Sequence, residues 1–312
     1  MIAPEPAGPR LVLRAPCKIN LSLEVLGRRP DGYHEIRTIM HTVDLCDELA
    51  FAVRLDGALT LSCDDPAVPA DGTNLVLRAA HLLRERGDPA AGAAIALRKR
   101  VPPGGGLGGG SADAAITLLA LRDLWELRVT DDDLAEMAAR LGSDVPFFLR
   151  GGTALCEGRG ERVSRLPVGP AMHFVLVMPD LHVSTREVYA ACGNGLTTPA
   201  PAVKVQAVWH SGDIGLIGGS LRNDLEARAL ALHARLREIR DELDALKPRC
   251  RAQGVSLSGS GAAFCVLVED APAADRATGI LESALGVPCV AARSHSAWDF
   301  STSPLRVGRE ES

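Results

Sequence analysis

The sequence is poor in aromatic residues, has no surplus of positive charge and contains no long apolar run. Aromatic residues make up 4% of its 312 residues, and only two residues are tyrosines. The formal net charge is −5 at pH 7, which argues against a broad basic surface for nucleic acid or an anionic membrane. No segment is long enough to span a bilayer, and residues 1–10 lack the apolar core of a signal peptide. We therefore expect no nucleic-acid or membrane partner, and any anionic ligand must be held by local groups.

Cysteine pairs spaced as C-x-x-C are also missing. The eight cysteines stand at positions 17, 46, 63, 156, 192, 250, 265 and 289. Several lie in apolar segments, as Cys265 does between Phe264 and Val266. This usage argues against a zinc site or a disulfide framework, and it predicts reduced, mostly buried thiols in a cytoplasmic protein.

What the sequence does contain is a dense glycine run. Six glycines fill seven positions from 104 to 110, interrupted only by Leu107, between an extended segment at 94–100 and a helical one at 112–127. Without Cβ atoms, such a loop lets backbone N–H groups approach an anion, and the helix start adds partial positive charge. The run predicts a phosphate site; the alternative is a flexible linker, although linkers rarely open directly into an apolar helix.

Two common phosphate loops do not fit this run. The P-loop fails because Ser111 follows the last glycine with no lysine. The dinucleotide pattern G-x-G-x-x-G is met, as almost any run this dense would meet it, but Pro102 and Pro103 interrupt the strand that should precede it. A proline, three residues, then Gly-Leu-Gly with a serine beyond resembles instead the ATP loop of the GHMP kinases, the superfamily of galactokinase, homoserine kinase and mevalonate kinase.

The N-terminal segment alternates apolar and polar residues over 11–26, which predicts a half-buried strand. The alternation puts Lys18 and Asn20 on the same face, where spacing alone favours an exposed edge charge for the lysine. A turn, Arg-Arg-Pro-Asp-Gly, then brings Tyr33 and His34 to a hairpin tip.

The second half of the chain predicts alternating strands and helices. We expect strands at 173–178, 255–257, 262–268 and 287–292, helices at 184–191 and 273–285, one long helix with an apolar stripe over 225–246, a Gly/Pro-containing connection at 193–202, and a loose tail beyond about 296. The stripe leaves open whether the long helix faces the core or seams a coiled coil, so the protein is expected to be a monomer or a homodimer.

Several further motifs resemble one branch of the GHMP kinases, which phosphorylates 4-diphosphocytidyl-2-C-methyl-D-erythritol. They run in family order: A-P-C-K-I-N-L (15–21), R-P-D-G-Y-H-E (29–35), T-N-L-V-L-R-A-A (73–80), L-G-S-D-V-P-F-F (141–148), L-R-N-D-L-E (221–226) and L-S-G-S-G-A (257–262). The glycine loop indicates only the superfamily, whereas D-G-Y-H together with S-D-V-P-F-F indicates the branch.

The resemblance implies an α+β protein of two domains and a phosphoryl transfer from ATP with Mg²⁺. The domains are a ribosomal-protein-S5-like one over 1–166, which binds ATP, and a ferredoxin-like one over 167–312. The acceptor is the 2-hydroxyl of 4-diphosphocytidyl-2-C-methyl-D-erythritol, and the products are its 2-phosphate and ADP, in the non-mevalonate route to isoprenoids. The residues implied for ATP binding are Pro103, Gly104, Gly105, Gly106, Leu107, Gly108, Gly109, Gly110, Ser111, Asn74 and Lys99. The magnesium ligands stay unknown, and Ser111 is one candidate.

The same resemblance assigns the chemistry and the acceptor. Asp144 is the general base and Lys18 the cation that supports it; from the residues alone, Asp144 is as readily a helix N-cap. The acceptor residues are Asn20, Tyr33, His34 and Tyr189, with the two tyrosines sandwiching the cytosine and His34 reading its edge. From the residues alone, Asn74 is equally a turn residue and Lys99 an ordinary strand-end charge.

Two positions depart from the pattern. Cys17 replaces a smaller residue, which we expect to be tolerated, and Asp113 puts a carboxylate near the bound phosphates, where we expect it to cap the helix. Three other functions compete: a sister kinase for homoserine or another small alcohol, a non-catalytic nucleotide sensor on the same fold, and a nicotinamide-dependent oxidoreductase.

Overall fold

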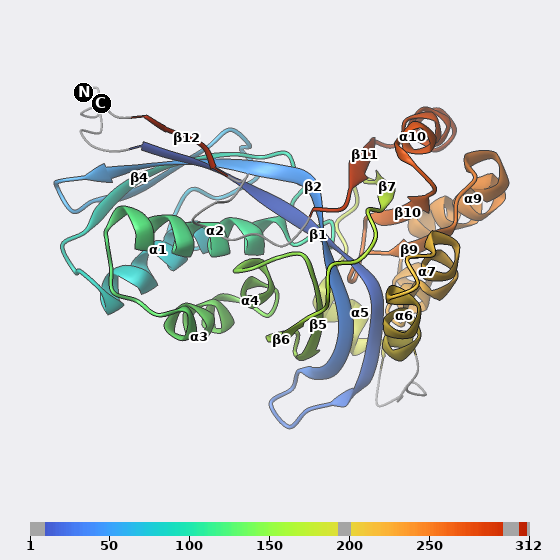
Figure 1. Cartoon of the computed structure of the whole chain (residues 1–312), viewed down its shortest axis with the longest axis horizontal. Helices are drawn as coiled ribbons and strands as arrows, with labels where there is room; N and C mark the ends of the chain where they lie inside the picture. Colours follow the sequence, from blue (N-terminus) through green and yellow to red (C-terminus); the bar gives the residue numbers. More distant parts are fainter. Residues whose placement is uncertain (1–9, 193–200, 296–305, 311–312) are drawn as a thin grey trace.

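The computed structural model describes residues 10–192, 201–295 and 306–310, and these form two layered bodies side by side (Figure 1). The elements of the first body are β1 (Arg10–Arg28), β2 (His34–Arg54), β3 (Leu59–Cys63), α1 (Leu75–Arg86), β4 (Gly92–Arg98), α2 (Gly109–Leu124), α3 (Asp131–Leu141), α4 (Val145–Phe148), β5 (Thr153–Gly158) and β6 (Arg162–Arg165). The remaining elements are β7 (His173–Val177), α5 (Thr185–Ala190), α6 (Pro201–Trp209), α7 (Ile214–Ser220), β8 (Arg222–Asn223), α8 (Glu226–Leu232), α9 (Ala234–Cys250), β9 (Gly254–Leu257), β10 (Phe264–Val268), α10 (Ala271–Leu285), β11 (Cys289–Arg293) and β12 (Arg306–Glu310).

The first body is a sheet covered on one face by helices. Its strands run in the order β12-β1-β2-β4-β3, with β5 paired to β2, β6 paired to β5 and β8 paired to β1. Helix α2 is apolar almost all round and lies at the centre of the core, between the sheet and α1, α3 and α4. The second body is a four-stranded sheet, β11-β7-β10-β9, whose one face packs on α9 and α10. The predicted α+β class is confirmed.

Over residues 15–25, strand β1 is buried on both faces, so the half-buried strand predicted from its alternation is wrong there; residues 11–14 keep the alternation. The other face of the four-stranded sheet packs on β1, where Ile19 and Leu21 contact Phe174, Leu176 and Trp209 in one apolar cluster. The four-stranded sheet therefore covers the apolar side of β1, whereas Lys18 and Asn20 on the polar side are buried against Gly106 and Gly259.

Two predictions for the second half need correction. The stripe over 225–246 belongs to two helices, because His233 is extended (φ −128°, ψ 102°) and separates α8 from α9. Both helices pack on the same sheet, so the apolar spacing continues across the break. The loose tail is wrong for residues 306–310, which form β12 against β1; residues 296–305 and 193–200 lie outside the described part.

The strands of the first sheet come from both halves of the sequence. Strands β8 and β12 pair with β1 although both follow residue 167. The division at residues 166 and 167 stays a prediction. None of the helices in the described part of the chain combines the length and the apolar character needed to cross a bilayer.

Candidate active site

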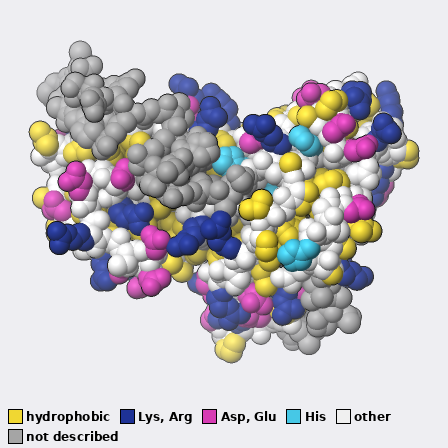
Figure 2. Space-filling model, in the orientation of Figure 1, with side chains coloured by type: hydrophobic (Ala, Val, Ile, Leu, Met, Phe, Trp, Pro, Cys, Tyr) yellow, Lys and Arg dark blue, Asp and Glu magenta, His cyan; other side chains and the backbone are white. Residues whose placement is uncertain are grey.

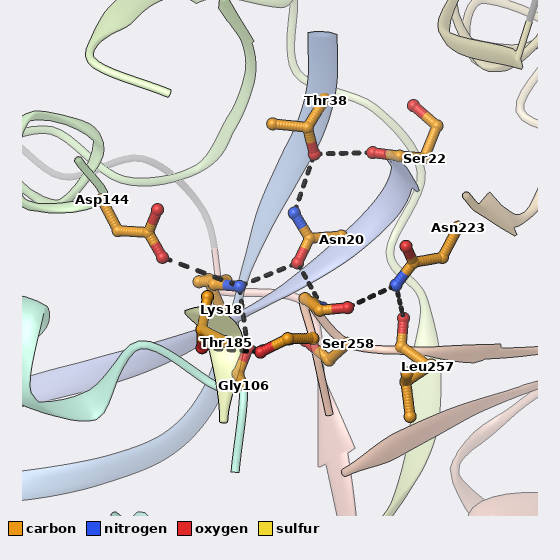
Figure 3. Close-up of polar contacts among 12 residues, drawn as sticks. Lys18, Asn20, Ser22, Thr38, Gly106, Asp144, Thr185, Asn223, Leu257 and Ser258 are labelled. Atoms are coloured by element: carbon orange, nitrogen blue, oxygen red, sulfur yellow. Dashed lines mark hydrogen bonds and ion pairs between the residues drawn. The ribbon is translucent and has the colours of Figure 1, made fainter. Parts of the chain in front are cut away.

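Lys18 lies at the junction of the two bodies, with its side chain only 4% exposed (Figure 3). Its ammonium Nζ donates to Asn20 Oδ1 and to the carbonyl of Gly106, both at 2.8 Å, and lies 3.7 Å from Asp144 Oδ2. The exposed edge charge that spacing alone favours is therefore wrong. Three oxygen atoms from three separate segments fix the direction of one buried cation.

Asp144 precedes the short helix α4, but its side chain makes no capping hydrogen bond. The helix is anchored by three fully buried side chains, Val145, Phe147 and Phe148. The carboxylate is 29% exposed, so it contacts the buried ammonium on one side and remains accessible on the other. A carboxylate placed in this way can accept a proton from a molecule that enters from solvent.

The glycine loop begins α2 at Gly109 and packs its backbone against the turn 258–261. Gly104, Gly106 and Gly108 have φ angles of 75°, 74° and 72°, which side-chain-bearing residues rarely adopt. A Cβ on Gly106 would lie 2.1 Å from the Ser258 carbonyl oxygen. The first N–H groups of α2 have no acceptor within the helix, and Gly110 and Ser111 lie there near the surface.

Behind the loop is a cavity of about 300 Å³. It is lined mainly by apolar atoms, and its walls come from the loop and from the segment after β7. The loop side of the wall is formed by Pro102, Pro103, Gly105 and Leu107, and the other side includes Met178, Pro179 and Leu181.

Asp113 is not a helix cap, contrary to the prediction, because it lies inside the first turns of α2 and is fully buried. Its Oδ2 is 3.0 Å from Lys99 Nζ, which also donates to Asp47. Asp47 in turn accepts from the N–H groups of Arg100 and Val101. Burial raises the pKa of Asp113 to about 8 against the pull of Lys99, because one lysine faces two carboxylates. Burial alone would lower the pKa of Lys99, but Asp113 and Asp47 have the larger combined effect, so this pKa is raised.

Asn74 is the N-cap of α1, where Oδ1 accepts from the Val76 N–H at 2.9 Å and Nδ2 donates to the Pro69 carbonyl at 2.7 Å. Lys99 is 7% exposed and held between the two aspartates beneath the loop. The assignment of both residues to ATP stays a prediction.

The two tyrosines come from separate segments and have different partners. Tyr33, at the tip of the β1–β2 hairpin, is 52% exposed, and the Arg159 guanidinium lies 4.8 Å from its ring centroid. The Tyr189 ring is 5.2 Å from that of His34, at 31° between planes, and burial raises the pKa of the Tyr189 hydroxyl. His34 Nε2 is buried with no hydrogen-bond partner among the described residues.

Asn20 is buried and its amide is engaged within the protein. Oδ1 accepts from Lys18 Nζ and from the Gly259 N–H, and Nδ2 donates to Thr38 Oγ1 at 2.7 Å. Its predicted role toward the acceptor stays a prediction.

Two features of this site could not be predicted from the sequence. Arg159 lies between β5 and β6 in the sequence Gly-Arg-Gly. This sequence predicts a turn, but it does not predict the direction of the arginine side chain. The turn 258–261 joins two predicted strands, and only its density of glycine and serine signals a close backbone approach. Among the described residues, no group of three or more His, Cys, Asp or Glu side chains could hold a metal ion.

Comparisons with known proteins agree with this geometry. The GHMP kinases N terminal domain matches residues 74–152, and the GHMP kinases C terminal domain matches residues 202–286. The glycine loop beside a buried lysine, on this two-body fold, defines a GHMP kinase. A solved homoserine kinase from Cytophaga hutchinsonii shares the fold, with a TM-score of 0.72 and 21% identity over 92% of this chain and 95% of that one.

More similar proteins define the branch. The 4-diphosphocytidyl-2-C-methyl-D-erythritol kinases of Brevibacillus brevis and Pelotomaculum thermopropionicum are 41% and 43% identical to this chain, over 83% and 82% of it and 88% of each relative. A solved 4-(cytidine 5′-diphospho)-2C-methyl-D-erythritol kinase has a TM-score of 0.77 and 35% identity over 91% of this chain and 99% of that one. The chain belongs to the 4-diphosphocytidyl-2-C-methyl-D-erythritol kinase family. It is a kinase of isoprenoid biosynthesis that acts on a small molecule with ATP.

Proposed function

We propose that this kinase transfers the γ-phosphoryl group of ATP to the 2-hydroxyl of 4-diphosphocytidyl-2-C-methyl-D-erythritol, giving the 2-phosphate and ADP. The observation that carries the proposal is the Lys18–Asp144 pair, 3.7 Å apart and close to both the glycine loop and the acceptor residues. The names of the relatives supply the acceptor.

Asp144 is the general base in this proposal. As the acceptor hydroxyl attacks the γ-phosphorus, its proton passes to a carboxylate oxygen of Asp144, and the terminal P–O bond to ADP breaks. The Lys18 ammonium stays on the reacting side because the Gly106 carbonyl and Asn20 hold it in place. A fixed cation there stabilises the charge that develops on the oxygens.

The ATP site comprises residues 103–111 with Asn74 and Lys99. Backbone N–H groups of the loop and the first turn of α2 bind the β- and γ-phosphates, and the Ser111 hydroxyl adds a donor. The apolar cavity behind the loop is close enough to accept the nucleotide base. Mg²⁺ enters with ATP in this proposal, because proteins usually hold it through one or two carboxylates together with the substrate phosphates.

The acceptor site comprises Tyr33, His34, Tyr189 and Asn20, to which we add Arg159. His34 has an unpaired buried nitrogen for the cytosine edge, and the aromatic rings of the two tyrosines provide stacking surfaces. The diphosphate of the acceptor needs a cation, and Arg159 places one over Tyr33.

The test is ADP release with ATP, Mg²⁺ and 4-diphosphocytidyl-2-C-methyl-D-erythritol, run beside homoserine and mevalonate. We expect turnover confined to the cytidine-linked acceptor, with phosphorus NMR locating the new phosphate on the 2-oxygen. Asp144→Asn and Lys18→Ala should each lower kcat by about 100-fold while the KM for ATP stays near the wild-type value. Near wild-type turnover in Asp144→Asn would remove its role as base, and activity on homoserine alone would remove the proposed acceptor.

A further inference from the structure

The turn 258–261 contacts both Lys18 and the glycine loop. Ser258 Oγ donates to the Gly106 carbonyl at 3.0 Å, the same oxygen that accepts from Lys18 Nζ. A Cβ on Gly259, whose φ is 58°, would lie 3.3 Å from Lys18 Nζ. With the turn this close, any shift of its backbone changes the surroundings of the ammonium.

Asn223, at the end of β8, holds this turn (Figure 3). Its side-chain Nδ2 donates to the carbonyls of Leu257 at 2.8 Å and Gly259 at 2.6 Å, and its Oδ1 accepts from the Leu225 N–H at 2.9 Å. The residue is 6% exposed, so water does not replace these bonds easily. All three of these bonds join the Asn223 side chain to backbone groups of the second body.

The same turn also contacts β1, the strand that carries Lys18 and Asn20. The Gly259 N–H donates to Asn20 Oδ1 at 2.9 Å, and that oxygen also accepts from Lys18 Nζ. Strand β8 itself pairs with β1, with Asn223 beside Leu23. A continuous set of hydrogen bonds therefore leads from Asn223 through the Gly259 backbone and Asn20 to Lys18.

We propose that Asn223 is a positioning residue for the phosphoryl transfer. It fixes the turn so that Asn20 and the Gly106 carbonyl hold the Lys18 ammonium toward Asp144. The proposal rests on the roles given above to Lys18 and Asp144. A lysine has a long flexible side chain, and its direction in a buried site is set by the acceptors around it. Asn223 acts on those acceptors and touches neither substrate.

The test compares Asn223→Asp with Glu226→Gln. The first variant keeps the size of the side chain and an acceptor for the Leu225 N–H, but it loses the two donors and sets a carboxylate against two carbonyls. Glu226 accepts from the Leu257 N–H at 2.8 Å and from Arg240, so its variant perturbs the neighbouring backbone without a bond to Gly259. We expect Asn223→Asp to lower kcat about ten- to a hundredfold with the KM for ATP nearly unchanged, and Glu226→Gln to retain kcat.

A double-mutant cycle with Asn20→Ala separates positioning from general loosening. If Asn223 acts through Asn20, Asn223→Asp should cause little further loss of kcat in the Asn20→Ala protein. Asn223→Ser, which keeps one donor, should have a kcat between those of the wild type and Asn223→Asp; it also serves if the aspartate variant fails to fold. Losses that multiply in the double variant, an unchanged kcat in both Asn223 variants, or an equal loss in Glu226→Gln would overturn the proposal. The cycle is measured with whichever acceptor the wild type phosphorylates, so a wrong substrate assignment would not decide this test.

Discussion

Adding one methyl group to Gly106 tests how the glycine loop and the turn 258–261 pack. The Cβ of Gly106→Ala would lie 2.1 Å from the Ser258 carbonyl oxygen and 2.9 Å from that of Gly261. Ordinary contact begins near 3.4 Å, so one backbone must move by about 1.3 Å. The φ of 74° adds a second cost, because an alanine in the left-handed region loses about 1–2 kcal/mol.

The two effects together predict a large loss of stability. Overpacking against backbone costs about 1–3 kcal/mol, which with the cost of the left-handed conformation gives about 2–5 kcal/mol. Each kcal/mol lowers the Tm of a chain of this size by about 2 °C, so the expected decrease is roughly 4–10 °C. We also expect kcat to fall, because the displaced Gly106 carbonyl is an acceptor for Lys18.

Gly110→Ala is the matched control in the same loop. Its Cβ would meet nothing closer than Leu75 Cδ1, at 3.9 Å, and the residue is helical. Replacing a helical glycine by alanine stabilises by up to about 1 kcal/mol, so its Tm should be equal to or above that of the wild type. Thermal unfolding monitored by circular dichroism measures both variants. Equal Tm values for Gly106→Ala and the wild type would refute the close packing of loop and turn.

Three further variants test other parts of the molecule. The pKa of Asp113 is about 8 in the folded protein and near 4 when unfolded, so the folded state binds more protons between these pH values and wild-type stability falls as the pH rises through them. Asp113→Asn lacks this group, so its Tm relative to that of the wild type should rise from pH 5 to pH 8.5. A Tm difference that stays constant over this range would contradict the raised pKa. Arg159→Gln should raise the KM for the acceptor about tenfold and leave the KM for ATP unchanged in steady-state assays. An unchanged KM for the acceptor would exclude a contact between Arg159 and the diphosphate of the acceptor. Trp209→Phe removes the indole N–H that donates to the Pro167 carbonyl at 2.9 Å and also part of a buried ring, so urea unfolding should show a loss of at least about 1 kcal/mol; a loss near zero would contradict both the bond and the packing of this side chain.

Local patterns in the sequence were sufficient for most single elements. The sequence Thr-Asp-Asp-Asp at 130–133 is a typical helix start, and Thr130 caps α3 there with reciprocal bonds to Asp133. The glycine loop leads into α2 as expected. Helix α1 was missed, although Asn74 caps it, because the preceding Asp-Gly reads more strongly as a turn.

Contacts between distant segments were beyond the reach of these patterns. The burial of Lys18 depends on Gly106 and on the second body, 88 and more residues away in sequence. The two-face burial of β1 depends on the sheet that packs on it, which residue alternation cannot reveal. Asp113 lies in a helix start where its type suggests capping, but its partner, Lys99, comes from a different element. The fold class could be predicted because the motifs resemble those of the GHMP kinases, whereas the polar contacts of the site depend on how the two bodies meet.

The pairing of β1 has a consequence for how the protein is made. This first strand has β12, the last strand, as a neighbour, and its Asn20 binds the Gly259 N–H, 239 residues away. A chain that leaves the ribosome N-terminus first exposes β1 until the second body has been translated. The ammonium of Lys18 then has none of the acceptors that the turn 258–261 stabilises. Phosphoryl transfer should consequently appear only after translation of nearly the whole chain, and fragments that stop before residue 254 should be inactive even where their own sheet has formed.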